Sequence, residues 1–94
     1  MTEPSHEWQV QIHRTPEKVL KRLPKDLRER IWARILDLRT EPRPNDSKKL
    51  LGSQYDNLYR VRVGNWRISY AIENDQLIIL ILEIASRGGA YRNL

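Results

Sequence analysis

The sequence YRVRVGNWRISY, residues 59–70, decides the expected fold of this chain. Apolar and polar residues alternate on both sides of Gly64-Asn65, a dipeptide that suits a two-residue hairpin turn. Two antiparallel strands joined at this turn can adopt one simple register. It pairs Val63 with Trp66, Arg62 with Arg67, Val61 with Ile68, Arg60 with Ser69 and Tyr59 with Tyr70.

The two faces of this predicted hairpin differ in their chemistry. One face is apolar and aromatic and should be covered by helices. The other, the arginine face, carries Arg60, Arg62, Arg67 and Ser69. Because like charges directly opposite one another destabilise a sheet and the hairpin contains no Asp or Glu, the pattern favours an anion bound from outside. The simpler alternative is a solvated sheet face, although such a face usually mixes charges of both signs.

Composition narrows the classes of protein that the chain can represent. Its 94 residues predict a single domain, 1–94, with a modest core. The absence of Cys excludes disulfides and thiol chemistry. The start, MTEPSHEWQV, lacks the features of a signal peptide, and the apolar run Leu77–Leu82 is shorter than the roughly 20 residues that span a bilayer. We therefore expect a soluble, cytoplasmic protein without a membrane segment.

The charges favour an acidic partner and argue against a metal or cofactor site. Seventeen basic against twelve acidic residues give a net charge of +5, which favours nucleic acid or an acidic protein as partner. The carboxylates from Glu41 onward are expected on loops and strand ends, apart from one another, so that no metal site and no cofactor is predicted. They are Glu41, Asp46, Asp56, Glu73, Asp75 and Glu83.

The remaining sequence predicts an α+β fold in the order strand, helix, helix, strand, strand, strand. Thr15-Pro16 suits a helix N-cap followed by proline at the first helical position. Leu23-Pro24 should end that helix. The two helices are expected to cover one antiparallel sheet, with the last strand in its interior beside the hairpin. The expected elements are strand 8–12, helices 15–22 and 25–38, a short approach to the sheet at 48–52, and strand 77–85.

Several motifs, taken in order, resemble the RelE/ParE toxin superfamily of bacterial toxin–antitoxin modules. They are Lys-Lys-Leu-x-Gly at 48–52, Leu-Tyr-Arg-x-Arg at 58–62, Trp-Arg-x-x-Tyr at 66–70, the hydrophobic last strand, and Arg87 followed by Tyr91. The resemblance covers nearly all of the chain from Trp8 onward. It implies a RelE-like fold, and the spacing from Arg87 to Tyr91 is shorter than in RelE itself.

The resemblance also implies an activity and a set of site residues. RelE-type members are ribosome-dependent mRNA endonucleases that cut without a metal ion, and their basic groups bind and polarise the scissile phosphate. Arg60 and Arg62 stand where RelE has lysines. The implied catalytic residues are Arg60, Arg62, Arg67, Arg87 and Tyr91, with Lys48, Lys49 and Arg92 as further RNA contacts.

The chemistry of these residue types agrees with that activity but leaves the proton acceptor open. A cluster of guanidinium groups can stabilise the negative charge of a phosphorane-like transition state. Arginine stays protonated and is a poor general base. Tyr91 could donate a proton or stack on an RNA base, and Lys48 or Lys49 could move into the site. His6 and His13 are both expected on the surface rather than in a catalytic site.

Two other functions remain open within the same fold. One is a ParE-like poison of DNA gyrase, which binds without cutting RNA, and the other is an inactive member that serves only as a partner of its antitoxin. The expected partners are a cognate antitoxin, the ribosome and mRNA, and operator DNA through the antitoxin complex.

Overall fold

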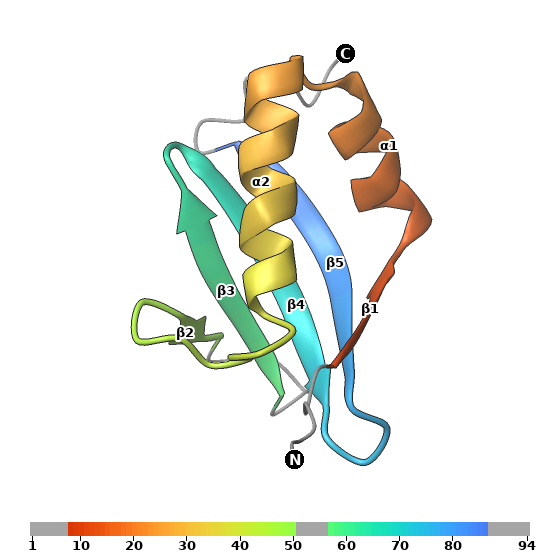
Figure 1. Cartoon of the computed structure of the whole chain (residues 1–94), viewed down its shortest axis with the longest axis vertical. Helices are drawn as coiled ribbons and strands as arrows, with labels where there is room; N and C mark the ends of the chain where they lie inside the picture. Colours follow the sequence, from red (N-terminus) through yellow and green to blue (C-terminus); the bar gives the residue numbers. More distant parts are fainter. Residues whose placement is uncertain (1–7, 51–56, 87–94) are drawn as a thin grey trace, which may run out of the picture.

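The structure is a computed structural model that describes residues 8–50 and 57–86. Two helices lie over one face of a five-stranded sheet whose strand order is β1-β5-β4-β3-β2 (Figure 1). The α+β class and the strand, helix, helix, strand order are confirmed. The elements are β1 (Gln9–Ile12), α1 (Arg14–Arg22), α2 (Lys25–Asp37), β2 (Lys48–Lys49), β3 (Leu58–Val63), β4 (Trp66–Glu73) and β5 (Ile78–Ser86).

The hairpin of β3 and β4 has the register that the sequence predicts. All five expected pairs are present, from Val63 with Trp66 to Tyr59 with Tyr70. Gly64 has a φ of 58°, a conformation that suits glycine at the first central position of a type II′ turn. The register is therefore determined by the turn and by the alternation on either side of it.

The helices close the apolar face of the sheet. An apolar stripe along α2 and its C-cap is fully buried, together with Val61 and Ile68 of the hairpin. The residues of this stripe are Ile31, Ile35 and Leu38. The break at Leu23-Pro24 occurs as predicted, and α2 begins at Lys25. Burying this stripe against the sheet supplies much of the hydrophobic stabilisation of the fold.

The start of α1 differs from the prediction. The helix begins at Arg14 with His13 as its N-cap, so the cap lies two residues earlier than the predicted Thr15. Pro16 then occupies the third helical position. An N–H there has no intrahelical acceptor, so its absence in proline costs no helical hydrogen bond. Its ring is buried against the rest of the protein, so tertiary packing outweighs the local capping preference.

The sheet is mixed rather than wholly antiparallel. Strands β2 to β5 are antiparallel to one another, but β1 pairs with β5 in parallel, from Gln9 with Ile78 to Ile12 with Ile81. No turn joins β1 to β5, because both helices and three strands intervene. Their relative direction therefore depends on how the helical hairpin crosses the sheet, which short-range sequence patterns do not encode.

A bulge in β5 decides which of its side chains face the helices. Ser69 of β4 pairs with Glu83 and the next residue, Tyr70, pairs with Ile81, so Leu82 is the extra residue. Ile79, Ile81 and Ile84 are all buried as a result. Strict alternation would instead place Glu83 on the buried face with Ile79 and Ile81. The bulge thus turns Glu83 to the open face and Ile84 into the core.

Candidate nucleic-acid interface

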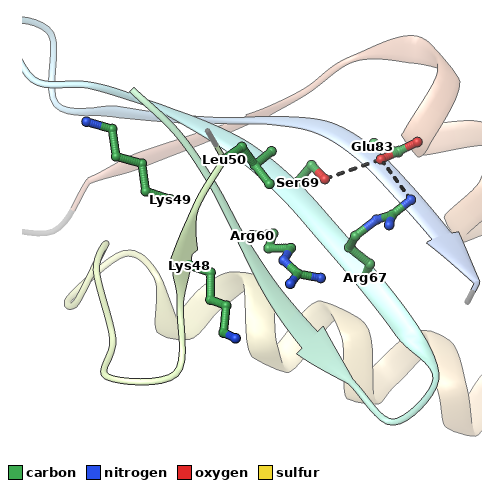
Figure 2. Close-up of a pocket in the computed structure, with 7 residues that line it drawn as sticks. All are labelled: Lys48, Lys49, Leu50, Arg60, Arg67, Ser69 and Glu83. Carbon is green, nitrogen blue, oxygen red and sulfur yellow. Dashed lines mark hydrogen bonds and ion pairs between the residues drawn. The ribbon is translucent and has the colours of Figure 1, made fainter. Parts of the chain in front are cut away.

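The open face of the sheet, opposite the helices, contains a basic groove of about 390 Å³. Four neighbouring strands contribute to it, because side chains of alternate residues on β3, β4 and β5 share this face (Figure 2). We refer to it as the basic groove. It is lined by Lys48, Lys49, Leu50, Arg60, Arg67, Ser69 and Glu83.

The groove is lined by four of the basic residues singled out from the sequence. Lys48 pairs with Arg60 across β2 and β3, and Arg60 pairs with Ser69 of β4. Arg67 lies two residues before Ser69 on the same face of β4 and also lines the groove. Figure 2 shows the side chains of Lys48, Arg60 and Arg67 around one hollow. Their three positive charges make it a suitable place for an anion.

The other predicted site residues lie elsewhere or outside the described residues. Arg62 is exposed on the same face, opposite Arg67, but does not line the groove. Lys49 pairs with Tyr59 and so alternates away from Arg60; in Figure 2 its amine points away from the two arginines. Three predicted site residues lie outside the described part of the chain, namely Arg87, Tyr91 and Arg92.

The expectation that Glu83 lies on a loop or at a strand end is wrong, because it lies within β5 and brings a carboxylate to the arginine face. Glu83 of β5 reaches this face through the bulge, and its Oε1 lies 3.6 Å from Nη2 of Arg67. The same oxygen accepts a hydrogen bond of 3.3 Å from Oγ of Ser69. The sequence of the hairpin contains no sign of this contact, because the acid comes from the next strand. The one sign of this contact in the sequence is that an acidic residue interrupts the apolar run of β5.

The contact with Glu83 leaves Arg67 available to an anion. Both side chains are about half exposed, 41% for Arg67 and 52% for Glu83. An ion pair of this exposure contributes about 0–1 kcal/mol to stability. In addition, Nε of Arg67 is buried and has no hydrogen-bond partner among the described residues. Buried donors without partners are uncommon in native proteins, so this guanidinium has hydrogen-bonding capacity that the described residues do not use.

The segment that carries Lys48 to the groove is anchored on the opposite side of the sheet. Tyr70, fully buried, donates a hydrogen bond of 2.7 Å to the carbonyl of Pro42. Burial raises the pKa of the Tyr70 hydroxyl from 10.0 to about 12. Arg34 of α2 holds Asp46 by a 2.6 Å hydrogen bond. These contacts fix residues 42–46 and thereby restrict where β2 can lie.

The neighbouring aromatic ring reinforces this anchor. Tyr59 stacks on Tyr70 with ring centroids 6.2 Å apart. The guanidinium of Arg43 lies 5.3 Å from the centre of the Tyr59 ring, and its Nε donates a 3.1 Å hydrogen bond to the Tyr59 hydroxyl. The start of the residue 42–46 segment is thus held against β3 and β4, and its end is held against α2.

Other chemistries have little support in the described part of the chain. No group of three or more His, Cys, Asp or Glu side chains comes close enough to hold a metal ion there. His13 is exposed at the N-cap of α1 and does not line the groove, while His6 lies outside the described residues. Neither of the two described helices has both the length and the hydropathy needed to cross a bilayer.

Comparison with known proteins places this chain and its fold in a toxin family. The model of the ParE toxin of the type II toxin–antitoxin system parDE matches residues 10–91. A candidate toxin, RelE1, of Methanocaldococcus jannaschii is 41% identical over 87 residues, which cover 89% of this chain and 94% of that protein. Toxin RelE of Mycobacterium tuberculosis is 31% identical over 90 residues, covering 93% and 89%.

A solved structure gives the same assignment. In the crystal structure of the archaeal RelE–RelB complex from Pyrococcus horikoshii, one chain superposes with a TM-score of 0.77 and 34% identity, over 89% of this chain and 99% of that one. The fold, the order of the motifs and these relatives agree with one another. The chain belongs to the RelE/ParE superfamily of type II toxin–antitoxin systems and is homologous to its RelE toxins.

Proposed function

We propose that this protein is a ribosome-dependent mRNA endonuclease, the toxin of a type II toxin–antitoxin system, and that it acts in the cytoplasm without a metal ion. The observation that carries the proposal is the basic groove, where Lys48, Arg60 and Arg67 surround one hollow and Nε of Arg67 has no described partner. A phosphodiester fits this arrangement in both charge and hydrogen-bonding capacity.

The groove suits the electrostatic part of RNA cleavage. When a 2′-hydroxyl attacks the neighbouring phosphorus, negative charge grows on the non-bridging oxygens. Guanidinium groups held in place before the reaction stabilise that charge more than they stabilise the ground state. Arg60 and Arg67 come from adjacent strands of a rigid sheet, so little reorganisation is required. Arg62, Arg87 and Tyr91 complete the proposed catalytic set, with Lys48, Lys49 and Arg92 as RNA contacts.

A second candidate function is the binding of DNA gyrase without RNA cleavage. It is favoured by one observation, that the family model matching residues 10–91 is that of the ParE toxin. The named relatives at 41% and 31% identity are RelE toxins, which supports the ribonuclease. An inactive, antitoxin-binding member would keep the fold without either activity.

Cleavage of ribosome-bound mRNA by the purified protein tests the proposal directly. Mapping of 5′ ends should reveal cuts within the A-site codon when ribosomes are present and none in free mRNA. The double variant Arg60→Ala/Arg67→Ala should abolish the cuts while its circular dichroism remains that of the wild type. If the wild-type protein leaves mRNA intact but inhibits supercoiling by gyrase, the second candidate is correct.

An antitoxin is the proposed protein partner, and operator DNA would be bound through the complex with it. The solved relative from Pyrococcus horikoshii is a complex of RelE with RelB. On this chain, an apolar groove of about 460 Å³ runs between α1 and α2 and includes Leu20, Leu36 and Trp32, which is 39% exposed. Strand β1, at the edge of the sheet, borders it. We expect an amphipathic peptide with acidic flanks to cover these surfaces and to approach the arginine face.

Coexpression with the product of the adjacent small open reading frame tests this partner. It should restore growth and co-purify with the toxin as a stable complex. Trp32→Glu in the toxin should weaken co-purification, because it places a charge in the apolar groove. Arg22→Glu, on an exposed position outside that groove's lining, is the matched control. If no neighbouring gene product binds or protects, the toxin–antitoxin partnership is contradicted.

A further inference from the structure

Glu83 is the one acidic residue among the described residues that line the basic groove. Its carboxylate is oriented by Oγ of Ser69 at 3.3 Å and by Nη2 of Arg67 at 3.6 Å. About half of its side chain remains exposed, so that a ligand in the groove can touch it. Figure 2 shows it between β4 and β5, beside the arginine that is expected to bind phosphate.

The stabilising effect of this side chain does not account for its position. An ion pair as exposed as this one contributes about 0–1 kcal/mol. A negative charge in a phosphate-binding groove also weakens binding of the ligand, because like charges repel. Nevertheless, the bulge at Leu82 turns this acid toward the groove instead of leaving the open face uniformly basic or apolar.

The groove otherwise lacks a group that can accept a proton at neutral pH. Its lysine and arginine side chains are cations there, and the hydroxyl of Ser69 is a very weak base. Attack by a 2′-hydroxyl requires that its proton be removed as the new bond to phosphorus forms. A glutamate carboxylate is the type of side chain that serves as a general base in such a step.

We propose that Glu83 is the general base of the endonuclease, an assignment that rests on the function proposed above. As the 2′ oxygen bonds to phosphorus, its proton passes to the Glu83 carboxylate. The bond from phosphorus to the 5′ oxygen breaks, and that oxygen takes a proton from water. The products are a 2′,3′-cyclic phosphate and a 5′-hydroxyl, and Glu83 returns its proton to solvent. Arg67, in contact with Glu83, holds the phosphate next to the base.

Glu83→Gln is the variant that tests this assignment. The amide has the same size and keeps an oxygen that accepts from Ser69, but it cannot take up a proton. We expect the single-turnover cleavage rate on ribosome-bound mRNA to fall by about 10²–10⁴-fold. Binding to programmed ribosomes should be unchanged or tighter, because a negative charge has been removed. Glu83→Ala should be equally slow, and added formate should restore part of its rate.

The pH dependence of cleavage gives an independent readout. The pH–rate profile of the wild type should contain an acid limb, as expected for a carboxylate base, and this limb should be absent in Glu83→Gln. His13 lies just beyond the end of β1, where its backbone N–H donates to the carbonyl of Ile81 of β5, and it does not line the groove. The profile of His13→Gln should therefore match the wild type. The charged groups that line the groove together with Glu83 are Lys48 and Lys49 of β2, Arg60 of β3 and Arg67 of β4.

A matched control separates the base from a general charge effect. Glu73→Gln removes the same charge at the end of β4, on the same face of the sheet as Glu83 but outside the groove lining, and should cleave at the wild-type rate. If Glu83→Gln cleaves as fast as the wild type or faster, Glu83 is only a counter-ion and the assignment is overturned. If formate fails to restore Glu83→Ala, it is likewise overturned. An inactive wild-type protein would instead refute the endonuclease proposal itself.

Discussion

Replacing Tyr70 by Phe should destabilise the protein through one buried hydroxyl. This hydroxyl donates a 2.7 Å hydrogen bond to the carbonyl of Pro42, and its residue is fully buried. A hydrogen bond of this kind contributes about 0.5–1.5 kcal/mol, and an unpaired acceptor adds to the loss. We expect the free energy of unfolding to fall by about 1–2 kcal/mol. For a domain of this size, each kcal/mol lowers Tm by about 4–8 °C.

The same hydroxyl predicts a specific pH dependence. Its pKa is 10.0 in the unfolded chain and about 12 in the folded protein. A raised pKa means that folding favours the protonated form, so the contribution is fully present below pH 10 and is lost as pH rises through 12. Between pH 8 and pH 11 the wild type should therefore lose roughly 1 kcal/mol relative to Tyr70→Phe. The two proteins should become nearly equal in stability near pH 11.

Urea denaturation followed by tryptophan fluorescence measures both effects. The matched control is Tyr59→Phe, which removes a hydroxyl from the neighbouring, partly exposed ring. That variant should lose less than about 1 kcal/mol at pH 8. Equal losses in the two variants would show that burial of the hydroxyl is not the cause. A difference between wild type and Tyr70→Phe that stays constant from pH 8 to pH 11 would refute the pKa argument.

Three further predictions concern the turn before β5 and the proposed active site. Leu77 has a φ of 57° and is 49% exposed, so Leu77→Gly should raise the free energy of unfolding by about 0.5–1 kcal/mol in urea denaturation. Arg62→Ala and Arg67→Ala should each abolish growth arrest on expression while changing stability by less than about 1 kcal/mol, as judged by thermal melts. Arg87→Ala should lower single-turnover cleavage by about 10²–10³-fold with near-normal ribosome binding. If the ring of Tyr91 stacks on an RNA base, Tyr91→Phe should keep the activity that Tyr91→Ala loses.

Much of the site follows from local sequence. The pairing of Arg62 with Arg67 depends on the turn at Gly64-Asn65 and on alternation over a few residues on either side. Both signals act between neighbours in the chain, so the register and the shared face of the arginines could be read directly. The break at Leu23-Pro24 is local for the same reason.

The tertiary structure decided the features that join distant segments. The parallel pairing of β1 with β5 depends on the path of the helices, and the burial of Pro16 shifts the start of α1. The position of Glu83 depends on fitting Ile81 and Ile84 under the same helices, which requires a bulge between them. Core packing acts across the whole chain, and a one-residue change of phase reverses which face a side chain occupies. The sequence alone therefore determined a basic sheet face, and only the folded chain placed a carboxylate within it.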